Sequence, residues 1–363
     1  MGTALRGRLR SRGRASGHRR SRGVRRGAAG AVGRRRRAVS VADLRVEALR
    51  AAGAPGSARG RRANGGAPPN RRGESHLIEL RSSEASARID PADGGRIVSL
   101  VIAGVERILP KANARATAPA LYWGCYAMVP WPGRIAGGRI PTADGEVRLE
   151  ANLPPSAIHG LGFDKRWEVL AEGATTATLA CELAGLGWPF GGRATETITL
   201  GATSLDLELA VGEYTRAGPA GLGWHPWFIR PRAGDASLRL DAAEVLVLDT
   251  DQVPTGEARP VTPSEDLREG PPLGDRRLDH VYIGATGPAT VGWPDVDLVI
   301  EYGPNLTTVV VHTPGEGFCV EPQTMWPNAP LLAARGVPGT GLLTLRPGER
   351  LSARERWTWR ARS

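Results

Sequence analysis

Apolar and polar residues alternate with a period of two through most of the chain after His76. The clearest stretch is residues 204–211, where Leu205, Leu207 and Leu209 are separated by polar side chains. Residues 176–183 and 351–360 repeat this pattern. A strand with one face in the core and one face in water has this period, whereas an amphipathic helix has a period of 3.6. The pattern therefore predicts half-buried β-strands.

Further strands are predicted at 77–80, 85–90, 96–102, 147–151, 165–172, 194–200, 245–249, 297–302, 307–312 and 341–346. Clusters of Gly, Pro and Asp separate them, and no long amphipathic helix interrupts them, which argues against a βαβ architecture. We predict an all-β fold, a large antiparallel β-sandwich. Residues 110–145 and 212–235 lack the alternation and are rich in Trp, Pro and Gly, so we expect two long functional loops there.

Charge divides the 363 residues into two unlike parts. Residues 1–72 contain 21 arginines and two acidic residues, a net charge of +19, whereas the rest has 27 basic and 35 acidic residues, a net charge of −8. The first part has almost no periodic pattern of large apolar residues and cannot bury enough surface to offset its ordering entropy. We therefore expect a disordered Arg-rich tail at 1–72 and one folded domain at 73–363.

Three explanations of the tail remain open. Its arginines can bind nucleic acid or an anionic membrane. An Arg-rich, acid-poor segment also suits an organelle transit peptide, or the segment is upstream sequence translated from a start site placed too early. The folded part is mildly acidic, so any nucleic-acid binding would come from the tail alone.

The cysteines and the missing motifs narrow the chemistry. Cys125, Cys181 and Cys319 are far apart, odd in number and in no ligand-like spacing, which predicts buried reduced thiols and a cytoplasmic protein. Neither a membrane-spanning run nor a signal-peptide core is present. The sequence also lacks a nucleophile elbow, a phosphate loop, a dinucleotide-binding turn and a zinc-protease motif. We expect no metal and no organic cofactor.

Four short segments place polar chemistry among apolar or conformationally special residues. Taken alone, the polar residue of each segment is explained more simply as a surface or core side chain. However, an arginine held among prolines offers hydrogen-bond donors in a fixed geometry. A carboxylate in an apolar strand costs folding free energy unless it is paired or functional. Trp227 offers an apolar face to a sugar. The segments are Pro132-Gly-Arg134-Ile, His159-Gly, Gly223-Trp-His225-Pro-Trp227-Phe and Glu321-Pro-Gln-Thr, with Leu278-Asp279-His-Val-Tyr as a weaker fifth.

In this order the five segments resemble the aldose 1-epimerase (galactose mutarotase) family over residues 76–360. The resemblance implies a galactose mutarotase-like supersandwich with a sugar cleft across one face. It implies that Glu321 is the general base and His225 the general acid. Arg134, His159 and Asp279 would bind the sugar, and Trp227 would border it.

The implied activity is interconversion of the α and β anomers of a free hexose, in a monomer or homodimer without a cofactor. Two other functions stay open, a hexose-6-phosphate 1-epimerase using Arg230 and Arg232, and a non-catalytic carbohydrate-binding module. The sequence departs from the family at Gly133, where Asn is common, and at Trp227, where Tyr is common. The first departure removes a possible hydrogen bond to the sugar.

Deletion of residues 1–70 tests the division of the chain. We expect the remaining chain to keep its melting temperature and its activity toward sugars, because the tail contributes no apolar core. Thermal unfolding and a sugar assay on the full and shortened proteins measure this. Loss of sugar-directed activity on deletion would contradict it.

Overall fold

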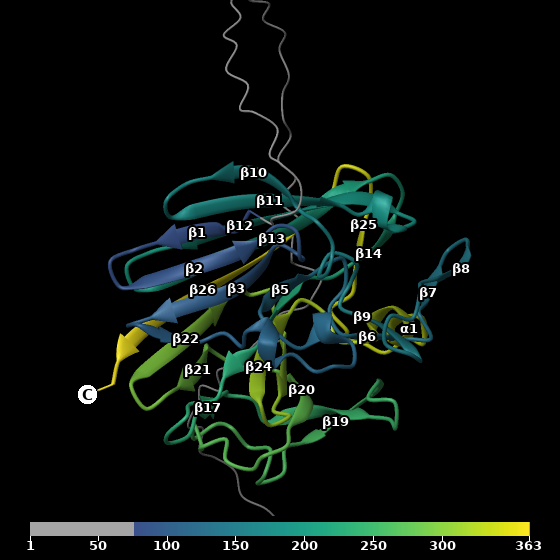
Figure 1. The fold of residues 1–363 in the computed structure, drawn as a ribbon. Coiled ribbons are helices and arrows are strands. Elements are labelled where there is room, and N and C mark those ends of the chain that lie inside the picture. Colours follow the sequence, from purple (N-terminus) through teal and green to yellow (C-terminus); the bar gives the residue numbers. More distant parts are fainter. Residues whose placement is uncertain (1–75, 363) are drawn as a thin grey trace, which may run out of the picture. The chain divides into compact units, whose positions relative to one another are not determined.

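The computed structural model describes residues 76–362, and the predicted tail at 1–72 lies outside that range. Two large antiparallel sheets contain most of the strands of the described chain (Figure 1). The prediction of a large antiparallel β-sandwich is confirmed. No helix in residues 76–362 is long and apolar enough to span a membrane.

The first sheet has twelve strands. Its neighbours, in spatial order, are β1 (Ile78–Arg81), β2 (Ala85–Asp90), β3 (Arg96–Ile102), β5 (Cys125–Met128), β15 (Gly223–Pro226), β24 (Gly317–Gln323), β23 (Thr308–His312), β20 (Asp279–Ile283), β18 (Glu244–Leu248) and β19 (Pro254–Pro260). In addition, β4 (Val105–Glu106) pairs with β3, and β16 (Phe228–Ile229) pairs with β24.

The second sheet has eight strands. Their order is β10 (Glu168–Glu172), β11 (Thr176–Glu182), β12 (Gly191–Leu200), β13 (Ser204–Tyr214), β26 (Leu351–Ala361), β22 (Val296–Tyr302), β21 (Ala289–Gly292) and β17 (Ser237–Arg239). Three small pairs complete the strands, namely β6 (Arg134–Ala136) with β9 (Ser156–Ile158), β7 (Arg139–Thr142) with β8 (Gly145–Arg148), and β14 (Gly218–Ala220) with β25 (Leu343–Leu345). Helix α1 (Ala329–Ala334) lies beside β6 and β7 in Figure 1.

The two expected long loops are only partly loops. Residues 110–145 contain β5, β6 and the start of a hairpin, and residues 212–235 contain β14, β15 and β16. Most of these strands are two to four residues long, too short to display an alternating pattern. Two of them, β5 and β15, lie in the middle of the twelve-stranded sheet.

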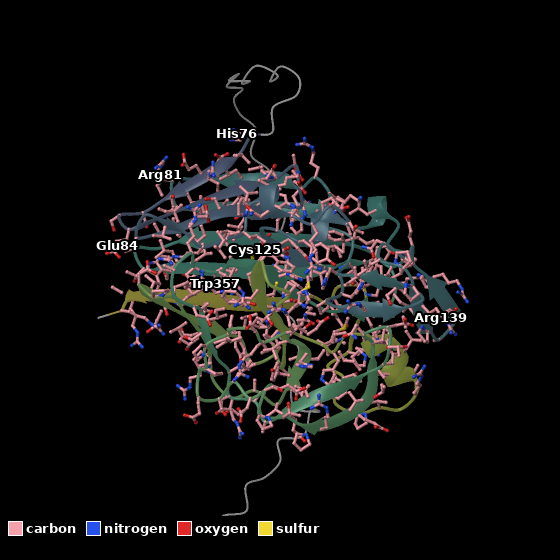
Figure 2. The ribbon with its side chains drawn as sticks, turned by 60° about the horizontal axis from the view of Figure 1, so that its bottom comes forward. His76, Arg81, Glu84, Cys125, Arg139 and Trp357 are labelled. Atoms are coloured by element: carbon pink, nitrogen blue, oxygen red, sulfur yellow. The ribbon has the colours of Figure 1, made fainter. Side chains whose placement is uncertain are left out.

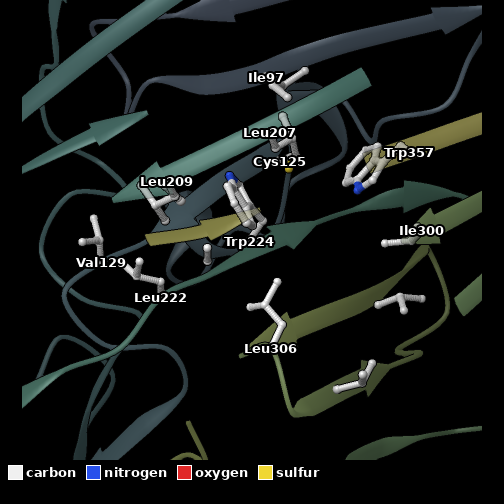
Figure 3. Packing of buried hydrophobic residues seen from close by; sticks show 14 of the residues in the cluster. Ile97, Cys125, Val129, Leu207, Leu209, Leu222, Trp224, Ile300, Leu306 and Trp357 are labelled. Atoms are coloured by element: carbon white, nitrogen blue, oxygen red, sulfur yellow. The ribbon is translucent and has the colours of Figure 1, made fainter. Parts of the chain in front are cut away.

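The core lies between the two large sheets. Cys125 and Trp224 from the first sheet share one buried cluster with Leu207, Leu209 and Trp357 from the second (Figure 3). Figure 2 shows Cys125 and Trp357 in the interior, and Arg81, Glu84 and Arg139 at the periphery. All three cysteines are free and buried, as expected.

A hydrogen bond crosses this core directly behind one short strand. The indole N–H of Trp224 in β15 donates to Oε1 of Glu196 in β12 at 2.7 Å. Because successive side chains of a strand point to opposite faces, the core position of Trp224 places His225 on the outer face of the sheet.

Glu355 gives the fold a pH dependence that can be measured. Its side chain is buried in β26, Oε2 accepts a hydrogen bond from Trp357 Nε1 at 2.8 Å, and burial raises the pKa of the carboxyl to about 8. The folded state therefore binds the proton more tightly than the unfolded state. This contribution to stability is fully present below the unfolded pKa of about 4.5 and is lost as the pH rises through 8.

We expect Glu355→Gln to reduce the loss of stability on alkalinisation, because the amide cannot ionise. Melting temperatures of both proteins between about pH 6 and about pH 9 measure this. The matched control is Glu208→Gln on the outer face of β13, which should follow the wild-type protein. The same pH dependence in wild type and Glu355→Gln would show that Glu355 is not the group responsible.

Candidate active site

A cavity of about 260 Å³ opens on the outer face of the twelve-stranded sheet. The strands beneath it are neighbours in the order β15, β24, β23 and β20. Their outward-facing residues line the cavity, and their alternate residues belong to the core, as with His225 beside Trp224. Six residues singled out in the sequence lie around this one cavity: Arg134, His159, His225, Trp227, Asp279 and Glu321.

The centre of the cavity wall is a buried histidine–carboxylate contact. Nε2 of His225 lies 3.2 Å from Oε1 of Glu321, across the boundary between β15 and β24. The amide of Gln323, two residues further along β24, donates to the other carboxylate oxygen at 3.1 Å. The Gln323 hydrogen bond therefore orients the carboxylate with one oxygen toward the histidine.

Burial disfavours charge on both partners. It raises the pKa of Glu321, an effect strengthened by the nearby carboxylate of Asp279 and opposed by the Gln323 hydrogen bond. It also lowers the pKa of His225, helped by the neighbouring His159 and His312. The raised pKa of Glu321 and the lowered pKa of His225 mean that the pair holds a single proton, carried by Glu321, over a wide pH range.

Two aromatic rings stack against the His225 imidazole. Tyr126 stacks on it with centroids 4.8 Å apart, and Trp227 stacks with centroids 5.3 Å apart. The Trp227 indole N–H is fixed by the Leu121 carbonyl at 2.7 Å. Only 2 % of Trp227 is exposed, so this residue mainly supports His225 and forms part of the cavity wall.

The small pair β6–β9 brings Arg134 and His159 to the rim. Arg134 begins β6 and is paired with Ile158, directly before His159. His159 has a left-handed φ of +59°, and Gly160 follows with φ +79°, where a Cβ would lie 2.0 Å from the Val129 carbonyl oxygen. Only glycine fits at 160, and the tight turn points His159 into the cavity.

His159 is a neutral imidazole in this setting. The Gly133 N–H donates to its Nδ1 at 3.3 Å, which leaves the ring proton on Nε2. Burial, followed by the charge of Arg134, lowers the pKa of His159 to about 3. His159 can therefore donate a hydrogen bond to a ligand oxygen without carrying charge.

A second histidine–carboxylate contact faces the first. Asp279 and His312 are directly opposite in the β20–β23 ladder, with Oδ1 and Nδ1 3.4 Å apart. Burial raises the pKa of Asp279, but His312 and the more distant Arg134 outweigh it, so the net shift is downward. Asp279 is therefore held as a carboxylate and can accept hydrogen bonds from hydroxyl groups.

Sequence reasoning missed several lining residues, above all His312, Arg115 and Gln323. His312 was inside a predicted strand and opposite in parity to the core residue Val311, which was the available signal. The two arginines named for a phosphosugar, Arg230 and Arg232, do not line this cavity. They border a different one with Trp293 and Asp295, so that alternative loses the residues on which it depended.

The chain is a large antiparallel β-sandwich with a buried histidine–carboxylate contact in a cavity on one sheet. The sequence model for aldose 1-epimerase matches residues 76–358, and the chain belongs to the aldose 1-epimerase family. The uncharacterised protein YphB of Escherichia coli K12 is 24% identical over 294 residues, covering 76% of this chain and 98% of YphB.

Solved structures share the fold. A galactose mutarotase-like protein from Clostridium acetobutylicum aligns with a TM-score of 0.70 and 19% identity, covering 80% of this chain and 96% of that one. Galactose 1-epimerase from Lactobacillus acidophilus aligns with a TM-score of 0.65 and 17% identity, covering 81% and 97%. The expected galactose mutarotase-like fold is therefore confirmed.

Packing against Pro327 explains why residue 133 is a glycine. It has φ +65°, and a Cβ there would lie 2.6 Å from Cγ and 2.7 Å from Cβ of Pro327. Asparagine tolerates a positive φ, so the obstacle is the proline ring and not the backbone angle. The Pro327 ring therefore occupies the space that an Asn side chain at position 133 would need.

We expect Gly133→Asn to destabilise the protein by about 1–3 kcal/mol through overpacking. The cost should be smaller in a Pro327→Gly background, where the clashing ring is absent. Denaturant unfolding of the four proteins in a double-mutant cycle separates this coupling from the separate backbone effects of the two changes. Strictly additive free energies would contradict the proposed contact.

Proposed function

We propose that this protein is an aldose 1-epimerase that interconverts the α and β anomers of a free hexose by acid–base ring opening and closure. The observation that carries the proposal is the buried contact between His225 and Glu321, 3.2 Å apart in a cavity. Arg134, His159 and Asp279 surround the contact with hydrogen-bonding groups. The volume of about 260 Å³ lies just below the usual range for drug-sized ligands and suits a monosaccharide.

The reaction needs one proton removed and one delivered. Glu321 in its ionised form takes the proton of the C1 hydroxyl, and protonated His225 delivers a proton to the ring oxygen. The C1–O5 bond then breaks to give the free aldehyde. Rotation about C1–C2 exposes the other carbonyl face, and closure with the roles reversed gives the other anomer.

The single proton held by His225 and Glu321 fits this scheme. A neutral pair has the proton on Glu321, and transfer to His225 yields the base and the acid without exchange with solvent. Burial deprives ionised Glu321 and protonated His225 of water, and the hydroxyl groups of a bound sugar would solvate these two charges instead. Arg134 and the Nε2–H of His159 can stabilise negative charge developing on a sugar oxygen.

A non-catalytic sugar-binding module would use the same cavity. Such a module needs hydrogen-bond donors and acceptors but has no need for a buried base beside a buried acid, which costs folding free energy. The presence of both Glu321 and His225 therefore favours catalysis over binding alone.

Polarimetry of freshly dissolved α-D-glucose and α-D-galactose tests the proposal. We expect the full chain to accelerate mutarotation, and Glu321→Gln and His225→Asn each to lose ~10²–10⁴-fold of the catalysed rate, the usual contribution of one acid or base. Glu355→Gln is the matched control, since it changes an equally buried carboxyl away from the cavity and should keep turnover.

Circular dichroism and thermal unfolding establish that each variant folds. A folded Glu321→Gln protein with full activity would overturn the assignment of the base. Binding of a sugar by the wild-type protein without any acceleration would instead favour the binding module.

A further inference from the structure

Cys319 lies beside the proposed acid and base without a part in the reaction. The donor atoms of His225, Cys319 and Glu321 all lie within 4.8 Å of one another, and all three side chains are buried. In residues 76–362 no other three His, Cys, Asp or Glu side chains meet this condition. Cys319 and Glu321 are two residues apart in β24, so both point to the outer face, and His225 comes from the adjacent β15.

The three donors are those that Zn²⁺ and similar ions prefer. An imidazole nitrogen, a thiolate and a carboxylate oxygen form a mixed set typical of zinc, at about 2.0–2.3 Å from the ion. Two donors bound at about 2 Å with a tetrahedral angle are about 3.3 Å apart, close to the 3.2 Å between His225 Nε2 and Glu321 Oε1. The thiol has to approach by a side-chain adjustment to complete the set.

The cavity supplies both the access route and the remaining coordination position. His225 and Glu321 line it, so an ion entering from solvent meets them first and keeps one face open to water or a hydroxyl group. Open zinc sites, such as those of zinc enzymes, have three protein ligands and a fourth position for water or substrate, whereas structural sites are closed by four protein ligands.

The surroundings support binding only in part. Gln323 fixes the carboxylate through its second oxygen, and the charge of Asp279 favours a cation. Arg134 opposes it, and Nδ1 of His225 has no hydrogen-bond acceptor in the described part of the chain. Metal-binding histidines usually have such an acceptor. These features predict reversible binding that a chelator removes.

We propose that His225, Cys319 and Glu321 form an inhibitory site for a thiophilic divalent ion such as Zn²⁺. The ion binds in place of the proton shared by His225 and Glu321, and that proton and the Cys319 thiol proton are released to solvent. No oxidation or reduction is involved. Inhibition rests on the proposed function, but metal binding by these residues does not.

Titration of the full chain with Co²⁺ tests the binding directly. We expect the intense charge-transfer absorption of a thiolate–cobalt bond, which Zn²⁺ then removes by displacing Co²⁺. Cys319→Ser should lose this absorption, and Cys181→Ser, a buried cysteine change in β11, should keep it. A folded wild-type protein without thiolate–cobalt absorption would overturn the proposal.

Enzyme assays then test inhibition, with each variant compared to its own metal-free rate. We expect Zn²⁺ to suppress mutarotation, EDTA to restore it, and Cys319→Ser to weaken inhibition by about tenfold or more, since even loss of an outer partner of a ligand costs about 10–100-fold. Equal Zn²⁺ sensitivity in wild type and Cys319→Ser would refute the site. Absence of any mutarotation, with the cobalt absorption present, would count against the proposed function alone.

Discussion

The site depends on the antiparallel pairing of two strands, the four-residue β15 and the seven-residue β24. The pairing brings a histidine and a glutamate nearly a hundred residues apart in sequence to within 3.2 Å. Strand geometry then fixes the directions of their side chains. Each residue is next to one whose side chain is buried in the core, and neighbouring side chains of a strand point to opposite faces. Trp224 next to His225, and Val320 next to Glu321, are both buried in the core between the sheets. A one-residue slip of either strand would turn His225 or Glu321 into the core.

Burial gives this pair its chemical character. In water at neutral pH, a glutamate is ionised and a histidine is largely neutral. Both side chains exchange protons freely with solvent there. In the cavity, desolvation disfavours charge on both, so the pair retains one proton and resists gaining or losing another. Such a pair suits the proposed reaction, which delivers one proton to the substrate and recovers one from it. The same burial makes the pair costly to the fold, which the surrounding core must offset.

Much of the fold was predictable because alternation is a local property of the sequence. The pattern in β13 and β26 identified both strands and their core-facing residues. Local segments also pointed to Arg134, His159, His225 and Glu321. The strands β5 and β15 were missed because a four-residue strand shows at most two alternations. His312 and Cys319 were missed as site residues because their roles depend on which distant strand pairs with β23 or β24, and a single sequence does not encode that register in any local pattern.

The rings around His225 explain why an uncharged histidine can still be held in one orientation. A neutral imidazole gains little from ion pairing, so packing has to fix it. Tyr126 and Trp227 both stack against the imidazole, and His159 meets it edge-on with centroids 4.9 Å apart. Tyr126 is in turn held by the buried guanidinium of Arg96, which lies 4.6 Å from its ring centroid and donates to the carbonyls of Trp123, Ala120 and Phe163. The position of the His225 imidazole is therefore set by a chain of packed groups that extends from the cavity to Arg96, whose terminal nitrogens are anchored on backbone carbonyls.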